Sequence, residues 1–254
     1  MLYIKYLKIL IKGQLEYRLS FWITVVGHFF VPMLHFVAMW AMFERFETIA
    51  GWTRAEAMLC LGVSSTGLAL AECFARGFDM FSALIIKGDF DRIMLRPRGT
   101  VVQVLGGDFN VTRLARVAQG LLVTLIALRG MAVQRLGGVV VAMMILCSAV
   151  IFAGLFVIGA TMCFFTTEGL EVINVFTYGG QRASSYPLTI YPPWLLRFFV
   201  LVVPIGCANY LPMMYLTGRA GPLYALTPLA GMLFIAPCLW IWRHGVRHYL
   251  STGS

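Results

Sequence analysis

The segment LGGVVVAMMILCSAVIFAGLFVIGATMCFFTT, residues 136–167, decides the fold class, because none of its 32 residues is Asp, Glu, Lys or Arg. A helix needs about 20 apolar residues to cross the hydrocarbon core of a bilayer. Backbone amide and carbonyl groups find no water there and must bond within the segment, which favours a helix. The sequence therefore predicts a protein that crosses a membrane.

The whole chain has the composition of an integral membrane protein. Of its 254 residues, 60% are hydrophobic and 12% are charged, whereas average soluble chains are about 25% charged. The net charge of +9 fits the basic residues that gather on the cytoplasmic side of membrane proteins, so no nucleic-acid partner is expected. The six cysteines stand singly in apolar segments without metal-ligand spacing, so no metal site is expected.

The hydrophobic pattern predicts an all-α integral membrane protein with a single membrane domain, residues 1–254. In residues 1–18, lysines form one stripe of a helix whose other positions are mostly apolar. This pattern predicts an amphipathic helix at the membrane interface; the alternative is an inward extension of the first span. Six transmembrane helices are predicted, over residues 19–43, 55–76, 113–129, 137–164, 169–188 and 222–243.

The position of the fifth span is open on hydropathy alone. Residues 169–188 contain acidic, amide and basic side chains among apolar ones, so the segment is either a polar loop or a span lined by other helices. If it is a span, residues 193–216, which Pro204 and Pro212 interrupt, enter the outer leaflet and return as a re-entrant helical hairpin. If it is a loop, the charge-free run 198–218 is itself the fifth span.

Basic residues predict the orientation of the chain. Residues 1–18, 76–116 and 243–254 hold 13 of the 20 Lys and Arg residues. Loops on the cytoplasmic side of a membrane are enriched in these two residue types. Both termini are therefore predicted to lie in the cytoplasm, and the hairpin at 193–216 outside.

The sequence IIKGDFDRIMLRPRG, residues 85–99, predicts a short cytoplasmic helix that an N-cap aspartate starts and a proline ends. Phe90, Ile93 and Met94 follow at helical spacing and form an apolar face. An exposed apolar face indicates docking to a partner, although packing on lipid headgroups or on neighbouring spans explains the spacing equally well. The residues of this candidate docking helix are Gly88, Asp89, Phe90, Arg92, Ile93, Met94, Arg96 and Pro97.

Two motifs and the order of the elements resemble the permease subunits of type-2 ABC exporters, in particular a bacterial subgroup of small stand-alone permeases. The motifs are GDFDRIMLRP, residues 88–97, and EGLEVINVFTYGGQRASSYPLTIYPPWLLRFFVLVVPIGCANYLP, residues 168–212. The resemblance covers essentially the full chain. It implies that residues 84–98 are the coupling helix region that docks on an ATPase, and it favours 169–188 as the fifth span with an extracellular re-entrant hairpin.

The resemblance also implies an assembly in the bacterial cytoplasmic (inner) membrane, with two ATP-binding cassette ATPase subunits and a second permease, identical or homologous. The chain has no G-x-x-x-x-G-K-[ST] sequence, so it lacks the loop that holds ATP phosphates. ATP and Mg²⁺ are expected on the ATPase, and no cofactor on this chain.

The predicted function is the non-catalytic membrane half of an ATP-driven exporter for an amphipathic, lipid, glycan or drug-like substrate. The alternative is a channel or a signalling scaffold without ATP-driven transport. A membrane enzyme is disfavoured, because no acid, base and nucleophile stand together in the sequence.

Polar residues of the fifth span are candidates for the translocation path: Tyr178, Gln181, Arg182 and Tyr186. Arg182 is the most informative, because an ionisable residue inside a membrane is costly and usually faces a bundle interior or an aqueous cavity. Two interpretations are open: it meets an anionic group of the substrate, or it pairs with a neighbour or reaches the interface.

Other polar residues have structural interpretations. Glu168 and Glu171 form either a second cytoplasmic turn that faces the ATPase or an acidic helix start. Glu72 and Arg76 are four apart and predict an ion pair within one helix. The histidines at 28 and 35 share one helix face and predict hydrogen bonds between helices.

Overall fold

The protein is described by a computed structural model that covers residues 11–131, 136–166 and 169–249. Within these residues, five helical stretches are long and apolar enough to cross a membrane. They are α2 (Arg18–Arg45), α3 (Arg54–Phe74), η1 with α8 (Val111–Arg113 and Leu114–Arg129), α9 (Gly137–Met162) and the stretch Pro222–Arg247, which comprises η3 (Pro222–Leu226), α14 (Thr227–Met232) and α15 (Ile235–Arg247). The predicted all-α membrane fold is confirmed.

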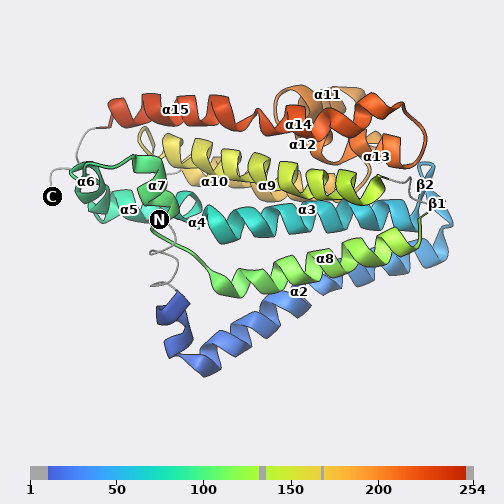
Figure 1. The fold of residues 1–254 in the computed structure, drawn as a ribbon, viewed down its shortest axis with the longest axis horizontal. Coiled ribbons are helices and arrows are strands. Elements are labelled where there is room, and N and C mark those ends of the chain that lie inside the picture. Colours follow the sequence, from blue (N-terminus) through green and yellow to red (C-terminus); the bar gives the residue numbers. More distant parts are fainter. Residues whose placement is uncertain (1–10, 132–135, 167–168, 250–254) are drawn as a thin grey trace.

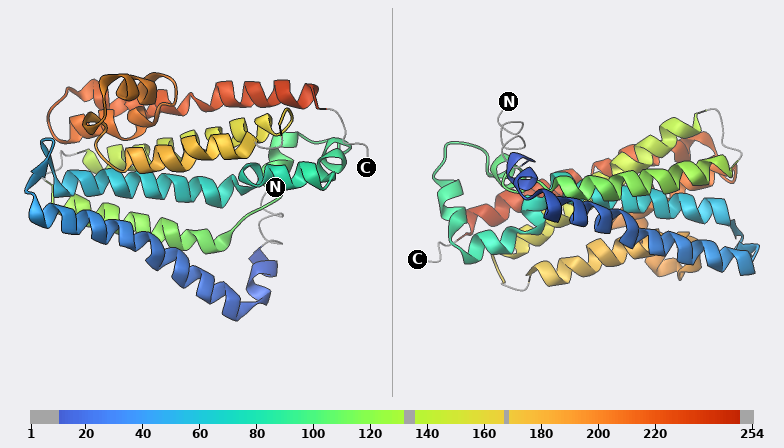
Figure 2. Two further views of the ribbon diagram at one scale, coloured as in Figure 1. Left: turned by 180° about the vertical axis from the view of Figure 1, so that it is seen from behind. Right: turned by 90° about the horizontal axis from the view of Figure 1, so that it is seen from below.

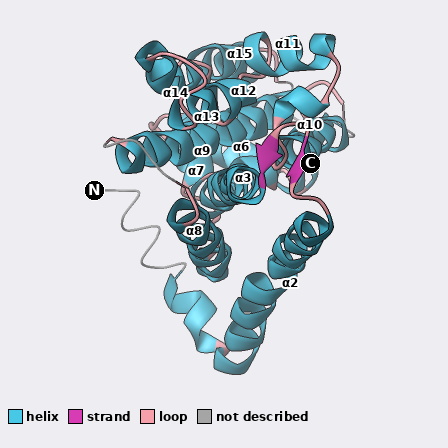
Figure 3. Ribbon diagram, turned by 90° about the vertical axis from the view of Figure 1, so that its right-hand side faces the viewer, coloured by secondary structure: helices cyan, strands magenta, loops and turns pink. Residues whose placement is uncertain are grey.

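The helices lie side by side in a layered bundle with α3 in its middle (Figures 1 and 3). α8 and α2 cover one side of α3, and α9, α10 (Gly169–Ser184) and α15 cover the other. α2 slants away from the bundle toward its first residues, as the rear and lower views also show (Figure 2). We call the two ends of the bundle the α6 end, where α6 (Asp89–Met94) lies, and the β end, where the β-hairpin lies.

The centre of the bundle is held by close approaches of small residues. A Cβ atom added to Gly62 of α3 would lie 2.9 Å from the backbone nitrogen of Thr124 in α8, and Gly120 of α8 approaches Thr66 of α3 in the same manner. Gly67 of α3 similarly faces Ser148 of α9. Small residues let helix backbones approach closely in a membrane, which is the role that Gly62 and Gly67 have in α3.

Short helices and an aromatic cluster build the α6 end. The helices are α4 (Arg76–Asp79), α5 (Phe81–Ile86), α6 and α7 (Thr100–Leu105). Six rings pack together with most centroid separations between 4.9 and 5.5 Å, largely in edge-to-face geometry, which aromatic quadrupoles favour. This aromatic cluster consists of Phe78, Phe81, Phe90, Phe164, Trp242 and Tyr249.

The β end carries a small sheet and a bent helical hairpin. Strands β1 (Thr48–Ile49) and β2 (Trp52–Thr53) pair antiparallel, and their turn uses Ala50 and Gly51 at φ 52 and 77. After η2 (Leu188–Ile190), α11 (Pro193–Leu201) meets α12 (Ile205–Ala208) and α13 (Tyr210–Leu216) at an angle of 80°. This bend is that of a broken span or a re-entrant loop, and the side of the membrane on which it lies stays a prediction.

The predicted fifth span corresponds to α10, which is 16 residues long and contacts both α9 and α3. Its amide and hydroxyl groups form hydrogen bonds inside the bundle, so α10 packs among the other helices despite its low hydropathy. Of the predicted interfacial helix, residues 11–16 are helical, residues 1–10 lie outside the described residues, and Arg18 already belongs to α2. Gln14 binds Phe109 and Val111 and so ties this segment to the loop before α8.

Candidate functional site

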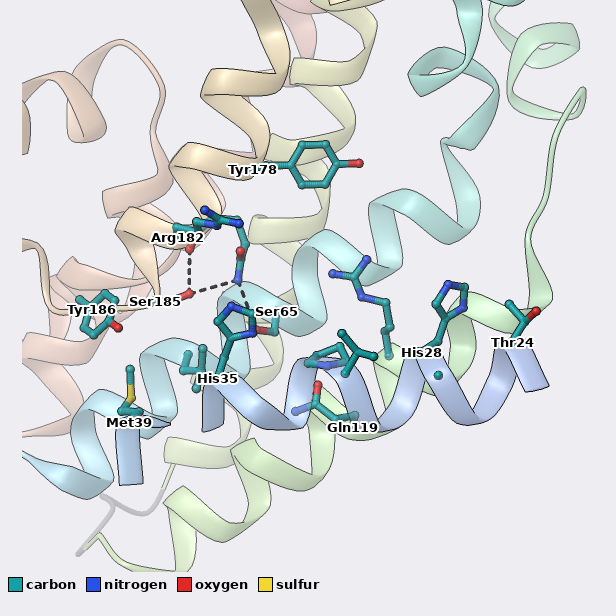
Figure 4. A pocket seen from close by; sticks show the side chains of 16 residues that line it. Thr24, His28, His35, Met39, Ser65, Gln119, Tyr178, Arg182, Ser185 and Tyr186 are labelled. Carbon is teal, nitrogen blue, oxygen red and sulfur yellow. Dashed lines mark hydrogen bonds between the residues drawn. The ribbon is translucent and has the colours of Figure 1, made fainter. Parts of the chain in front are cut away.

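A cavity of about 850 Å³ lies between α2, α3, α8 and α10 (Figure 4). It runs along the helices, with Thr24 and His28 near one end and Met39 and Tyr186 near the other. All four residues predicted for the translocation path line it, so the structure brings them together. The lining residues are Thr24, Gly27, His28, Val31, Pro32, His35, Met39, Leu61, Ser65, Arg116, Gln119, Tyr178, Gln181, Arg182, Ser185 and Tyr186.

A buried carboxylate lies behind the cavity wall, on the side nearer the α6 end. Glu72 of α3 has 0% exposure and accepts hydrogen bonds from Arg113 at 3.0 Å, from Arg116 and from the Tyr178 hydroxyl at 3.3 Å. A buried charge requires such partners. The predicted Glu72–Arg76 pair is wrong, because the two arginines at the start of α8 reach Glu72 across the helix interface.

Arg76 instead pairs with Asp79 at 2.7 Å, within the short helix α4. Burial raises the pKa of the Asp79 carboxyl, and the positive charge of Arg76 opposes this change. This pair lies beyond α3 and does not line the cavity, so the electrostatics of the cavity depend on Glu72 and on the arginines around it.

Hydrogen bonds between helices position the cavity walls. His28 of α2 bonds through Nδ1 to the Thr112 hydroxyl at 3.0 Å, which confirms the predicted interhelical bond for this histidine. Gln181 of α10 donates to the Ser65 hydroxyl of α3 at 3.3 Å and to the Ser185 hydroxyl at 3.1 Å. These bonds fix the α10 wall against the middle of α3.

A second polar group, next to the cavity wall, holds α10 to the bent hairpin. Ser64 and Ser184 lie 2.8 Å apart through their hydroxyls, and the Asn209 side chain donates to Ser64 at 2.7 Å and to the Cys60 carbonyl at 3.2 Å. All three polar side chains are buried. The break between α12 and α13 is therefore tied to both α3 and α10.

Arg182 stands apart from these networks. Its side chain is exposed and lines the cavity, and among the described residues no ion pair or side-chain hydrogen bond to it is seen. The prediction that it faces a cavity agrees with this position. The alternative in which it pairs with a neighbouring side chain finds no support within the described part of the chain.

The candidate docking helix differs from the prediction in its apolar face. Phe90 is fully buried in the aromatic cluster, so its prediction as an exposed contact is wrong: several rings within reach bury it more completely than a docked partner would. Ile93 is half-buried. The exposed apolar residues are Ile86, Met94 and Leu95, of which Leu95 is 85% exposed.

The helix signals around this segment are partly as predicted. Gly88 takes φ 68 and separates α5 from α6, and α6 ends before Pro97. Gly88 is the N-cap, however, and Asp89 is the first residue of the helix, because the left-handed backbone that separates the helices requires glycine. The Asp89 carboxylate pairs with Arg92 at 3.4 Å. The arginines at 92 and 96 are exposed.

Comparison with known proteins identifies the family. A family model described as "ABC-2 family transporter protein" matches residues 29–253. The chain belongs to the ABC-2 transporter family. No curated protein and no solved structure matches the chain. As an ABC-2 permease it is a multi-pass membrane protein with a transport role, in an ABC transporter system with ATPase partners.

Several residues of the ABC-2 permease cavity were not assigned from its sequence. Arg116 and Gln119 contribute from α8 and are three residues apart, so they share a helix face. His28 and His35 contribute from α2, and their shared face is the sequence signal that could have indicated the cavity. Of the predicted second turn, Glu168 lies outside the described residues and Glu171 stands in the first turn of α10.

Proposed function

We propose that this ABC-2 permease is the membrane subunit of an ATP-driven exporter, and that the cavity between α2, α3, α8 and α10 receives the substrate. The observation that supports this most is the presence of a large cavity, lined by polar and apolar side chains, among helices of membrane-spanning composition. Ionisable and amide side chains are costly inside a bilayer and mark substrate pathways when they line a cavity. The volume of about 850 Å³ falls within the range of small-molecule sites, about 300–1,000 Å³.

The orientation in the proposal follows the basic residues. The segments 1–18, 76–116 and 243–254 hold 13 of the 20 Lys and Arg residues, and the described parts of these segments lie toward the α6 end of the bundle (Figure 1). The α6 end then faces the cytoplasm of a bacterium, with the β end and the bent hairpin outside. The substrate enters from the inner side and leaves at the β end.

The ATPase contact in the proposal is an exposed surface at the α6 end. We define this docking surface as the apolar residues Ile86, Met94 and Leu95 with the exposed bases Lys87, Arg92 and Arg96. Apolar side chains that are surrounded by charges and stand outside the hydrocarbon core are typical of protein interfaces. Two cassette ATPases, which hold ATP and Mg²⁺, and a second permease, identical or homologous, complete the proposed assembly.

The aromatic cluster connects this surface to the membrane helices. Phe90 stands on α6, and its ring lies 5.0 Å from Phe81, 5.4 Å from Phe164 after α9, and 6.2 Å from Trp242 of α15. Dense packing transmits displacement, because buried rings have no free space into which to move. If the bound ATPase displaces α6, the ends of α9 and α15 therefore move with it. Transport requires that substrate and ATP each favour one of the two resulting conformations.

The proposal is tested by the replacement Leu95→Asp in the full-length permease, purified from native membranes. We expect the wild-type protein to carry a cassette ATPase, identified by mass spectrometry, and to hydrolyse ATP. The amount of ATPase that co-purifies with the charged variant is expected to be at least tenfold lower than with the wild type, because an interface core excludes unpaired charges. Thermal stability should stay within about 1 °C, because surface substitutions away from buried features change stability little.

The matched control is Phe46→Asp, an equivalent change at an exposed residue of the β end. It is expected to retain the ATPase, because it lies on the opposite side of the membrane in the proposed topology. Absence of any cassette ATPase from the wild-type preparation would contradict the proposed function. Equal ATPase content in the wild type and the Leu95 variant would contradict the docking surface.

A further inference from the structure

The charges along the cavity are of one sign. Arg116 and Arg182 are the formally charged residues that line it, and no Asp or Glu is among the described lining residues. Glu72, behind the wall, contacts both Arg116 and Arg113 and offsets one of these two positive charges. Arg182 has no such counter-charge within the described part of the chain. The cavity therefore carries an unbalanced positive charge at Arg182.

The depth of Arg182 makes this charge significant. The neighbouring residue, Gln181, bonds to Ser65, which lies near the middle of α3 (Arg54–Phe74). Since α3 is long enough to span the membrane, Arg182 sits near mid-depth and not at a headgroup layer. An unpaired arginine at that depth is costly unless an aqueous space or an anion meets it.

A second unsatisfied group lines the same cavity. Gln119 is 3% exposed, and its Oε1 atom is buried without a hydrogen-bond partner. Among the residues that the structure describes, its Nε2 atom reaches only the Met33 sulfur, at 3.8 Å. A buried polar atom without a partner costs about 1–3 kcal/mol, so Gln119 adds a second costly polar group to the wall of this cavity.

The remaining walls are apolar. Val31, Pro32 and Met39 of α2 and Leu61 of α3 line the same space as the polar residues. A small inorganic anion would leave these side chains uncovered, whereas an alkyl or aryl group would bury them at roughly 25 cal/mol per Å². The complement of this cavity is thus a molecule with one anionic group and an apolar body.

We propose that the cavity of this permease binds an anionic amphiphile, whose phosphate or carboxylate contacts the Arg182 guanidinium while its apolar body lies against Val31, Met39 and Leu61. The proposal rests on the proposed function for the direction of transport but not for binding itself. The guanidinium presents parallel donors that match the oxygens of a phosphate or carboxylate. The anion comes either from a free amphiphile or from a lipid headgroup, and the chemistry of recognition is the same.

The test measures equilibrium binding to the purified full-length permease in nanodiscs of phosphatidylcholine, without ATPase or nucleotide. The probe is radiolabelled dodecylphosphate, below its micellar concentration. Dodecanol, dodecyltrimethylammonium and inorganic phosphate are competitors that separate the charge from the chain. We expect dodecylphosphate to bind at least about tenfold more tightly than dodecanol or dodecyltrimethylammonium, because a hydrogen bond to a charged group contributes about 1.5–3 kcal/mol, a factor of about 10–100. It should also bind more tightly than inorganic phosphate, which has the charge but leaves the apolar wall uncovered.

Variants assign the effect to Arg182. Arg182→Gln is expected to weaken dodecylphosphate binding about 10–100-fold, and Arg182→Lys to restore most of it, since the charge remains. The matched control is Arg197→Gln in α11, an exposed arginine that does not line the cavity, and it should bind as the wild type does. Each variant is required to elute as one symmetrical peak in size-exclusion chromatography.

A further arm identifies the source of the anion. If the ligand is a lipid headgroup, phosphatidylglycerol in the nanodisc should compete with dodecylphosphate for the cavity of the wild-type protein and weaken its binding. If the ligand is a free amphiphile, the affinity for dodecylphosphate should be unchanged in these nanodiscs. Either result supports anion recognition. Equal binding of dodecanol, equal binding of inorganic phosphate, or wild-type affinity in Arg182→Gln would overturn the proposal. These failures leave the ATPase association test unaffected, so the two proposals are separable.

Discussion

Replacement of Glu72 by glutamine tests the electrostatic design of the bundle. Glu72 is fully buried and faces two arginines, whereas Arg113 and Arg116 keep 17% and 23% side-chain exposure. Glutamine has nearly the same shape as glutamate, so packing is preserved and only the charge is lost. Both guanidinium groups then remain largely buried without a carboxylate.

The magnitude follows from the exposure of the partners. Removal of one partner from a fully buried ion pair costs about 3–5 kcal/mol. The arginines here retain some contact with solvent, so we expect the lower end, about 3 kcal/mol. For a chain of 150–250 residues a change of 1 kcal/mol shifts the melting temperature by roughly 2–4 °C, so the variant should melt about 6–12 °C lower.

The assay is thermal denaturation of the purified permease in one detergent, followed by the fraction that stays monodisperse. The matched control is Asp89→Asn, which removes the carboxylate of an ion pair at 3.4 Å whose side chains are 80% and 40% exposed. Exposed pairs contribute about 0–1 kcal/mol, so this variant should melt within about 3 °C of the wild type. Equal melting of both variants would refute the assignment of Glu72 as a buried counter-charge.

Two further predictions separate packing from surface roles. Gly62→Leu is expected to prevent stable folding, because even its Cβ would meet the Thr124 backbone at 2.9 Å. Gly27→Leu, where a Cβ meets nothing within 4 Å, should yield a monodisperse protein. Equal yields of the two variants in size-exclusion chromatography would count against the close α3–α8 contact. Phe90→Ala is expected to destabilise the permease by about 3–5 kcal/mol. Met94→Ala, at a side chain that is 44% exposed, is expected to destabilise it by less than about 1 kcal/mol. If the Met94 variant melted at the lower temperature of the two, Phe90 would be the exposed side chain.

The spans could be predicted from the sequence because hydropathy reports burial in lipid directly. Residues 137–164 were predicted as a span, and the helix there is Gly137–Met162. The predicted span 113–129 likewise overlaps α8 closely. The first segment is free of charge, and the three arginines of the second, at positions 113, 116 and 129, lie near its ends, so no tertiary contact competes with the local signal.

Side-chain partners could not be predicted at the same level. The spacing of Glu72 and Arg76 fits a helical pair, but α3 ends at Phe74, and the competing arginines on α8 are some forty residues away in sequence. Phe90 has the spacing of an exposed face, yet rings from α5 and α15 and from residues 163–166 after α9 surround it. Local periodicity identifies which residues share a face and gives no information on what covers that face.

Only some of the residues that line the cavity could be identified from the sequence. Arg182 could be singled out because a charge in an otherwise apolar segment is locally anomalous. Gln119 lies in a segment of ordinary amphipathic character, and only the packing of α8 against α2 reveals its unpaired oxygen. A site shared by four helices is defined by their arrangement, so its members on the less polar helices have no individual signal.

The arrangement of α3 explains how the two ends of the molecule are linked to the cavity. At the β end, Glu56 bonds to Arg219 at 3.2 Å, and the guanidinium lies over the Trp52 ring at 4.4 Å. At the other end, Glu72 binds the arginines of α8. Between them, Ser65 contacts the α10 wall. A displacement of α8 relative to α3 therefore breaks the charge contacts of Glu72 at the α6 end. A displacement of α10 relative to α3 breaks the Gln181–Ser65 bond at mid-depth and the Tyr178–Glu72 bond, so movement of either helix changes the cavity wall and the surroundings of Glu72 or Ser65.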